Sequence, residues 1–439
     1  MNADRKDVSP ANASSAAGTL SPVSTTITVL TPPGRGAVAT LEISGPGAAG
    51  QVSAHFESLA KSSEVSADRS PRIAAGDFTA NRIVVGYWRS PVGREQVVIA
   101  RRASDCFEVH CHGGRAVVEA IAESLVQAGA RQQDWQAWIA ARESDPLAAA
   151  ARRLLADAPT LRVAGILLDQ VRGALSRAIA DVRTLIARQQ HAAAVEQLQA
   201  LLATVKLGEH LTRRWRVVLA GPPNAGKSSL INALVGYERS IVAKLPGTTR
   251  DVLSVRTAIE GWPVELADTA GLSRTNDPLE QAGVELARSQ LTTADVVLWL
   301  MPCDGPTEKL DAITATFIGR AILVRSKCDL LDELSIADSG NAADSSQSAG
   351  FEQVRTLYQF SPREFLALPI SAHTGAGMPE LLRTVSERLV PSPPAPGSAV
   401  IFAIDQRIAC VIALAEIERG NWAEADRVLA VLCQRPAAE

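Results

Sequence analysis

A glycine-rich loop that ends in lysine and serine is the strongest chemical signal in the sequence. Residues 221–228 read Gly-Pro-Pro-Asn-Ala-Gly-Lys-Ser, after the apolar run 217–220 and before a helical pattern that begins at Ser229. Such loops bind phosphates through backbone N–H groups and the start of the following helix. Lys227 would contact the β- and γ-phosphates, and Ser228 would bind Mg²⁺. The sequence therefore predicts a nucleoside triphosphate site.

Two further segments would complete the magnesium site. Asp-Thr-Ala-Gly occupies 268–271, where Asp268 would hold Mg²⁺ through water and the Gly271 N–H would contact the γ-phosphate. Between this segment and the phosphate loop lies Gly-Thr-Thr-Arg-Asp at 247–251, in the place of the first switch segment of a GTPase. Thr249 is the best candidate there for a second hydroxyl ligand of the metal.

A third group of residues could select the base. Asp329 ends the segment Ser-Lys-Cys-Asp, and its carboxylate can accept two hydrogen bonds from guanine. Ser371 and Ala372 would offer backbone N–H groups to guanine O6. Ser326 stands where asparagine is usual, and it has no amide to connect one loop to the other, so we expect somewhat weaker nucleotide affinity. The nucleotide-binding candidates are Gly221, Asn224, Ala225, Gly226, Lys227, Ser228, Ser229, Thr248, Thr249, Asp268, Gly271, Ser326, Lys327, Asp329, Ser371 and Ala372.

Hydrolysis also needs an oriented water and a positive charge near the phosphates. Leu272 stands where Ras-like GTPases carry a glutamine, and an apolar side chain cannot orient water. Asn224 could instead coordinate a monovalent cation, K⁺, in place of an arginine finger, with carbonyl groups of 244–247 completing the cage. Alternatively, Asn224 only stabilises the turn of the loop. The catalytic candidates near the phosphates are Asn224, Lys227 and Arg250.

The elements that would position these residues form an α/β domain. Short apolar runs at 217–220, 264–267, 296–301, 321–324 and 365–369 alternate with helical patterns, as in a doubly wound sheet. We place this P-loop GTPase domain at 213–391. It contains a polar surface insertion at 332–350 and ends in a Pro-rich linker at 390–397.

Different patterns flank this domain. Strand-like runs at 27–30, 38–43, 82–88, 96–100 and 107–111, followed by a helical pattern at 117–126, predict an α+β domain over 23–118. Residues 119–212 and 399–439 have helical spacing, and Leu167, Val171, Leu175 and Ile179 predict the core-facing stripe of one bundle helix. The chain is therefore expected to be multidomain: an α+β N-terminal domain, an α-helical bundle domain in two parts, and an inserted α/β GTPase domain.

Composition limits the location and the partners of the protein. Hydrophobic residues make up 46% and charged residues 21%, which is typical of a soluble globular chain. The net charge of −3 gives no overall attraction for nucleic acid, so RNA would bind at a local patch or through a partner. Six cysteines without metal-site spacing indicate reduced thiols and a cytoplasmic location. No membrane span is expected, and the Ser/Ala/Thr-rich residues 1–22 indicate a flexible tail rather than a signal peptide.

Two N-terminal segments are more specific than the GTPase motifs. Thr-Pro-Pro-Gly-Arg-Gly-Ala-Val at 31–38, with Leu-Glu-Ile-Ser-Gly at 41–45, is one, and Glu-Val-His-Cys-His-Gly-Gly at 108–114 is the other. Together with the phosphate loop, these segments resemble the tRNA modification GTPase MnmE (TrmE) family. The chain looks like a divergent member of it.

The resemblance implies an N-terminal domain that dimerises and could bind a folate derivative, and a GTPase that potassium stimulates. It also implies a flavoprotein partner of the MnmG (GidA) type, with which the protein would modify the wobble uridine of certain tRNAs. The catalytic glutamate of the family corresponds to Glu280, which would orient the attacking water through a second water. Without the resemblance, Glu280 would read as a solvated surface charge.

Several family motifs are altered in this chain. Residues 102–105 read Arg-Ala-Ser-Asp where the family has Tyr-Thr-Gly-Glu-Asp, and the helical signature Phe-Leu-Asn-Gly-Lys is absent. The C-terminal Cys-x-Gly-Lys ending is also missing, and Cys433, its nearest match, reads as an ordinary helical cysteine. These changes leave an alternative, a GTP-binding regulatory switch that has lost the tRNA-modification activity.

Overall fold

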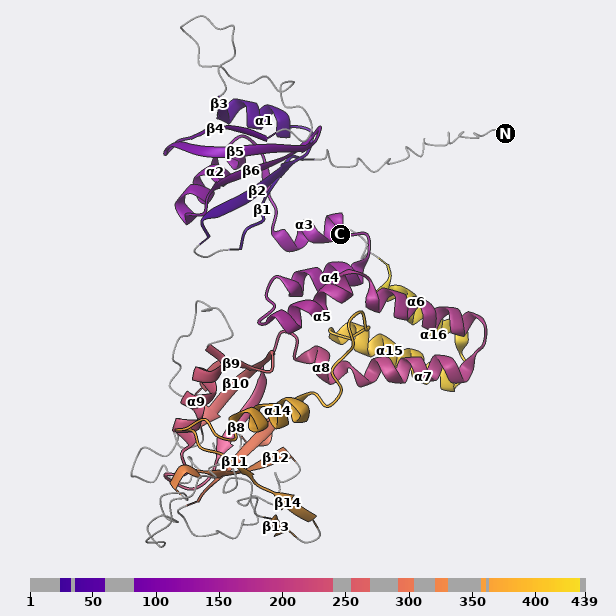
Figure 1. The fold of residues 1–439 in the computed structure, drawn as a ribbon. Helices are drawn as coiled ribbons and strands as arrows, with labels where there is room; N and C mark the ends of the chain where they lie inside the picture. The colour runs from indigo at the N-terminus through magenta and orange to yellow at the C-terminus, as the bar shows by residue number, and fades with distance from the viewer. Residues whose placement is uncertain are drawn as a thin grey trace, which may run out of the picture. The chain divides into compact units, whose positions relative to one another are not determined.

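The chain divides into two compact units, Met1–Arg142 and Glu143–Glu439 (Figure 1). The structure is a computed structural model, and it describes residues 24–32, 36–59, 83–239, 254–268, 291–303, 320–330, 357–360 and 363–434. The predicted tail at 1–22 and the predicted insertion at 332–350 lie outside these ranges. No helix in the described ranges has the length and apolar character to cross a membrane.

The centre of the first unit, in the residues that the structure describes, is a seven-stranded sheet. Neighbouring strands of this sheet are antiparallel except for the parallel pair β1 and β7. All five strands predicted in this part of the sequence are present. The spatial order is β3 (Phe56–Ser58), β4 (Ile83–Ser90), β5 (Gly93–Ala103), β6 (Cys106–His112), β2 (Val38–Ser44), β1 (Thr26–Val29) and β7 (Arg131–Gln132).

Helices α1 (Ala48–His55) and α2 (Arg115–Gln127) share one hydrophobic core with this sheet. Trp88 of β4 is fully buried, and its Nε1 donates a hydrogen bond of 3.0 Å to Ser124 Oγ of α2. Because α2 belongs to this core along its length, the first unit continues past residue 118, where the sequence placed a domain boundary. It also includes β7 and α3 (Trp135–Arg142).

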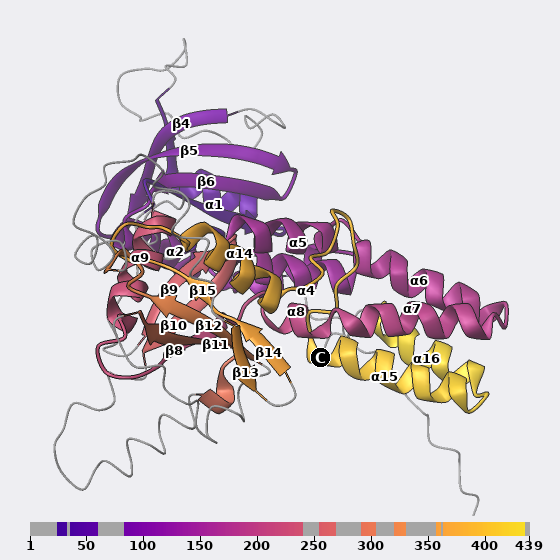
Figure 2. The same cartoon turned by 60° about the horizontal axis from the view of Figure 1, so that its bottom comes forward.

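The second unit contains a helical bundle built from two distant stretches of chain. The first stretch supplies α4 (Pro146–Leu155), α5 (Leu161–Val171), α6 (Ala174–Ala187), α7 (His191–Ala203) and α8 (Val205–Glu209), and the second supplies α15 (Ile404–Glu418) and α16 (Trp422–Leu432). Helix α15 packs on α7, and α16 packs on α6 (Figure 2). Arg183 of α6 joins them through hydrogen bonds of 2.6 and 3.2 Å to the Asp426 carboxylate of α16.

The apolar stripe that predicted one bundle helix is divided between two. Helix α5 ends at Val171, and α6 begins at Ala174 after Gly173, whose φ of 84° is a left-handed conformation that glycine adopts without strain. Leu167, Leu175 and Ile179 are nevertheless buried together in the bundle core. The spacing therefore identified core residues correctly, but the prediction of a single helix was wrong.

A six-stranded sheet forms the centre of the GTPase part. The described strands run in the order β15 (Leu368–Pro369), β12 (Ala321–Ser326), β11 (Val296–Pro302), β8 (Trp215–Ala220), β10 (Trp262–Asp268) and β9 (Ser254–Ile259), and all pairs are parallel except β9 with β10. Helices α9 (Lys227–Arg239) and α14 (Met378–Leu389) belong to this part. The single strand predicted at 365–369 is wrong. Only β15 joins the sheet, whereas β14 (Arg363–Leu366) forms a hairpin with β13 (Leu357–Phe360).

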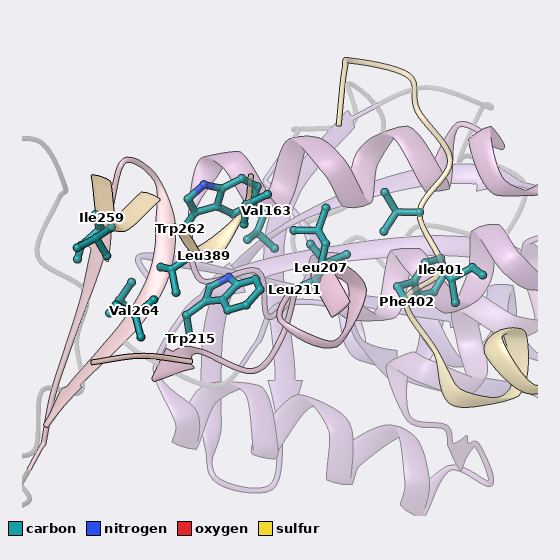
Figure 3. Packing of buried hydrophobic residues seen from close by; sticks show 14 of the residues in the cluster. Val163, Leu207, Leu211, Trp215, Ile259, Trp262, Val264, Leu389, Ile401 and Phe402 are labelled. Carbon is teal, nitrogen blue, oxygen red and sulfur yellow. The ribbon is translucent and has the colours of Figure 1, made fainter. Parts of the chain in front are cut away.

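The bundle and the GTPase sheet share one hydrophobic core. Figure 3 shows the side chains where they meet, with Leu207 and Leu211 from the helical side beside Trp215 of β8. At the same contact, Thr160 Oγ1 at the start of α5 donates a hydrogen bond of 2.7 Å to the carbonyl oxygen of Gly261, between β9 and β10. The second unit therefore packs as one body.

The chain that follows the Pro-rich linker forms hydrogen bonds with residues of the bundle. Gln170 Nε2 donates to the carbonyl oxygen of Ser398 at 2.9 Å, and Gln170 Oε1 accepts from Val400 N at 3.2 Å. Ile401 N donates to Thr204 Oγ1 at 2.9 Å. Val400 and Ile401 are buried, so this segment is part of the bundle core.

Candidate nucleotide-binding site

Four of the predicted site segments lie at the carboxyl ends of parallel strands. The phosphate loop follows β8, Asp268 ends β10, Ser326 ends β12, and Ser371 follows β15. Carboxyl ends of parallel strands meet at one edge of a sheet, where open α/β sheets bind their ligands. The fold therefore brings the four segments to the same edge.

The phosphate loop is compact and depends on glycine. Gly221 has a φ of 140°, and a Cβ atom placed on it would lie 2.3 Å from the carbonyl oxygen of Leu300 on β11. Asn224 and Gly226 also have positive φ values, 62° and 86°. Only a residue without a side chain fits the first position, and the loop that results turns its backbone into the start of α9.

The Lys227 side chain is hydrogen-bonded to the backbone of the phosphate loop. Its side chain is buried, and Nζ donates to the carbonyl oxygens of Gly221 at 2.9 Å and Pro222 at 2.8 Å. Burial lowers the pKa of the Lys227 ammonium below its usual value, and the Asp268 carboxylate acts in the opposite direction. A phosphate anion bound in the loop would favour the charged ammonium further.

Two of the predicted magnesium ligands, Ser228 and Asp268, lie within the described residues and contact each other. Ser228 Oγ donates a hydrogen bond of 3.0 Å to Asp268 Oδ2. A hydroxyl and a carboxylate are the oxygen ligands that Mg²⁺ prefers, and a magnesium site of this kind takes its remaining ligands from phosphates and water. In the ranges described above, no group of three or more His, Cys, Asp or Glu side chains could hold a metal.

The base-reading loop is connected to both of its neighbours. Ser326 is buried, and its Oγ donates a hydrogen bond of 2.7 Å to the carbonyl oxygen of Ala225 in the phosphate loop. The expectation that serine could not connect the loops is therefore wrong, because the two backbones approach closely enough for the short side chain. On the other side, Cys328 N donates to the carbonyl oxygen of Ile370 at 3.1 Å.

The last loop of the site is a tight turn. Ser371 is fully buried, its N–H donates to the carbonyl oxygen of Ala376 at 3.0 Å, and its Oγ accepts from Thr374 N at 3.1 Å. The Ser371 N–H is therefore used inside the turn, which favours Ala372 as the donor to a base. Several other predicted site residues lie outside the described ranges: Thr248, Thr249, Arg250, Gly271 and Glu280.

Sequence reasoning missed one pair of side chains beside this site. The Sγ atoms of Cys303 and Cys328 lie 3.0 Å apart at the ends of β11 and β12. Their separation along the chain carries no motif. The signal that could have found them is the prediction of two neighbouring parallel strands, each followed closely by a cysteine.

Comparisons with known proteins agree with this geometry. The family model described as "50S ribosome-binding GTPase" matches residues 216–327, and the one described as "GTP-binding protein TrmE N-terminus" matches residues 25–134. The tRNA modification GTPase MnmE of Synechococcus sp. (strain JA-3-3Ab) is 31% identical over 77% of this chain and 77% of its own length. That of Methylobacterium radiotolerans is 31% identical over 88% of this chain and 86% of its own. The chain, a GTP-binding hydrolase, therefore belongs to the tRNA modification GTPase MnmE family.

Proposed function

We propose that this protein hydrolyses GTP with Mg²⁺ held by Ser228, Thr249 and Asp268, and that it acts in modification of the wobble uridine of tRNA. The observation that carries the proposal is the 3.0 Å hydrogen bond from Ser228 Oγ to Asp268 Oδ2. It joins the phosphate loop to the strand end that precedes Gly271, the candidate sensor of the γ-phosphate. When bound there, Mg²⁺ neutralises charge on the β- and γ-phosphate oxygens.

Base selection falls to the loops after β12 and β15. The Asp329 carboxylate accepts hydrogen bonds from guanine N1–H and N2–H₂, and Lys327 lies beside the base. The Ala372 N–H donates to guanine O6. Support comes from the Ser326–Ala225 and Cys328–Ile370 hydrogen bonds, which hold the base-reading loop between the phosphate loop and the turn at Ser371.

The candidates for hydrolysis are a bound cation and the carboxylate of Glu280. Asn224 would hold K⁺, which would supply positive charge beside the phosphates, and Glu280 would orient the attacking water through a second water. Arg250 and Thr248 belong to the first switch segment. Asn224 is exposed in the phosphate loop, so its side chain is open to a cation beside the phosphates.

The GTPase domain, residues 213–391, is inserted into a helical domain whose first part begins after Arg142 and runs to residue 212, and whose second part is 399–439. The contacts of α15 and α16 with α7 and α6 support this arrangement. The N-terminal domain mediates homodimerisation and could bind a folate derivative. An MnmG (GidA)-like flavoprotein and tRNA are the expected partners. Support for tRNA comes from the relatives, whose name includes tRNA modification.

The test is GTP hydrolysis by the purified chain in KCl and in NaCl at equal ionic strength. We expect a faster rate in KCl, and loss of that difference in the Asn224→Ala variant. A Glu280→Ala variant should lose single-turnover hydrolysis while it still binds GTP. Equal slow rates in both salts would contradict the potassium mechanism.

The tRNA function is tested separately in a strain that lacks the gene. We expect wobble uridines to lose their modification and the intact gene to restore it. Unchanged uridines, with GTP hydrolysis intact, would favour a regulatory switch that has lost the tRNA-modification activity.

A further inference from the structure

Two thiols lie against each other beside the base-reading loop. Cys303 follows β11 and Cys328 follows β12, and these parallel neighbours are in register at Pro302 and Ser326. The two Sγ atoms are 3.0 Å apart. A disulfide bond is about 2 Å long, so a movement of about 1 Å would join them.

The two thiols differ in their surroundings. Cys303 is half-buried, and Arg325 Nε donates a hydrogen bond of 3.3 Å to its Sγ, a contact that stabilises negative charge on sulfur. Cys328 is buried, and its Sγ donates to the carbonyl oxygen of Arg325 at 3.2 Å. The contact with Cys303 and then burial raise the pKa of the Cys328 thiol, which keeps it protonated. Cys303 is therefore the thiol suited to attack first, and Cys328, 3.0 Å away, is placed to react with the oxidised Cys303 sulfur.

We propose that Cys303 and Cys328 form an oxidation site, in which a peroxide converts the two thiols to a disulfide and thereby weakens binding of guanine nucleotides. The Cys303 thiol loses its proton, the thiolate attacks hydrogen peroxide, an S–O bond forms and the O–O bond breaks, and the hydroxide that leaves takes up the released proton as water. The Cys328 sulfur then attacks the Cys303 sulfenic acid, the S–S bond forms, and hydroxide leaves with the proton of Cys328 as water. Two thiols and one peroxide thus give one disulfide and two waters.

The consequence for the nucleotide follows from where Cys328 lies, and it rests on the function proposed above. Cys328 stands between Lys327 and Asp329 in the base-reading loop, which is held by the Ser326 hydrogen bond to Ala225. Drawing Cys328 toward the end of β11 moves the backbone that orients the Asp329 carboxylate. Hydrogen bonds to guanine are lost over such a displacement, because they weaken steeply away from their preferred geometry.

The chemistry of the pair fits a reversible site. In a reducing compartment, disulfides that do form are usually transient and sense oxidants. Two thiols alone do not make a structural zinc site, and the described residues add no third metal-binding side chain to them.

The experiment compares the full chain before and after treatment with hydrogen peroxide. Non-reducing peptide mass spectrometry should find Cys303 joined to Cys328, and the affinity for a fluorescent GDP analogue should fall by about tenfold. Dithiothreitol should reverse both changes. A Cys303→Ser variant, altered at a residue outside the base-reading loop, should keep the affinity of the reduced protein and lose its response to peroxide.

The matched control is Cys106→Ser. Cys106 is also half-buried with an arginine donor, since Arg142 Nη2 lies 3.8 Å from its Sγ, but it belongs to the first unit. This variant should respond to peroxide as the unaltered protein does. Absence of the 303–328 linkage, or a linkage that leaves the affinity unchanged, would overturn the inference. Failure of the reduced protein to bind GDP would instead overturn the proposed function, because the linkage is detected without nucleotide.

Discussion

At the scale of single residues, a short hydroxyl side chain connects the two loops that must hold opposite ends of the nucleotide. Ser326 donates its hydrogen bond to the carbonyl oxygen of Ala225, and both residues are buried. A buried hydrogen bond of this kind contributes roughly 1 kcal/mol, and leaving its acceptor unpaired costs more. Ser326 therefore couples the position of the base-reading loop to that of the phosphate loop.

Replacing Ser326 by alanine should weaken GTP binding by about tenfold, because the Ala225 carbonyl loses its donor and the base-reading loop loses one attachment. Isothermal titration calorimetry measures the affinity directly. Ser386→Ala, at a half-buried position of α14 away from the site, is the control and should bind GTP normally. If the two variants bind alike, the hydrogen bond does not position the loop.

A buried thiol in α15 should make the stability of the bundle fall at alkaline pH. Burial raises the pKa of Cys410 from 9.0 to about 11. As pH rises above 9.0, the unfolded chain loses this proton before the folded chain does, so the free energy of unfolding falls.

From about pH 8 to about pH 10, the unaltered protein should lose about 1 kcal/mol more than the Cys410→Ala variant. Urea denaturation at both pH values, followed by circular dichroism, measures the difference. Other groups that titrate in this range act equally in the two proteins. Parallel losses in the two proteins would mean that Cys410 ionises in the folded state as easily as in the unfolded state.

At the scale of elements, the fit between α8 and the returning chain depends on a glycine. A Cβ atom on Gly208 of α8 would lie 1.7 Å from the carbonyl oxygen of Ile401. The close approach lets Thr204 Oγ1 accept the Ile401 N–H. The close packing of α8 therefore holds the chain at Ile401, just before α15.

Gly208→Ala should destabilise the second unit by about 3 kcal/mol, because backbone cannot move aside as a flexible side chain can. Gly165→Ala is the matched control, since Gly165 also lies in a helix but has open space at its Cβ position. That variant should be more stable by roughly 0.5–1 kcal/mol, the usual gain of alanine over glycine in a helix. Thermal unfolding monitored by circular dichroism compares both; equal melting temperatures would contradict the close packing.

At the scale of the whole molecule, the described residues form separate cores in the two units. One lies within the N-terminal sheet and its helices, and another runs from the bundle into the GTPase sheet. Leu211, on the short stretch of chain that joins α8 to β8, and Trp215, the first residue of β8, belong to this second core (Figure 3). The bundle and the GTPase sheet should therefore unfold together.

Leu211→Ala should cost the second unit about 3 kcal/mol, through lost apolar burial and the cavity that remains. Hydrogen exchange should rise both in α6 and α7 and in β8 and β11, and stay unchanged in β2 and β6. Leu41→Ala, equally buried in the first unit, should give the reverse pattern. Faster exchange confined to the bundle would show that the two parts unfold independently.

The sequence by itself determined the phosphate loop, the strands that carry its companion motifs, and the family, because these depend on local spacing and on residue types with few other uses. Local pattern did not place the break at Gly173, the division of the strand at 365–369, or the extent of the first unit, since each is decided by packing against distant chain.

Tertiary structure alone decided that Ser326 reaches Ala225, that Ser228 meets Asp268, and that Cys303 lies against Cys328. Each of these contacts joins residues of different strands or loops. Their distances depend on sheet register and on how closely neighbouring loops approach, and neither quantity is encoded in any short stretch of the chain.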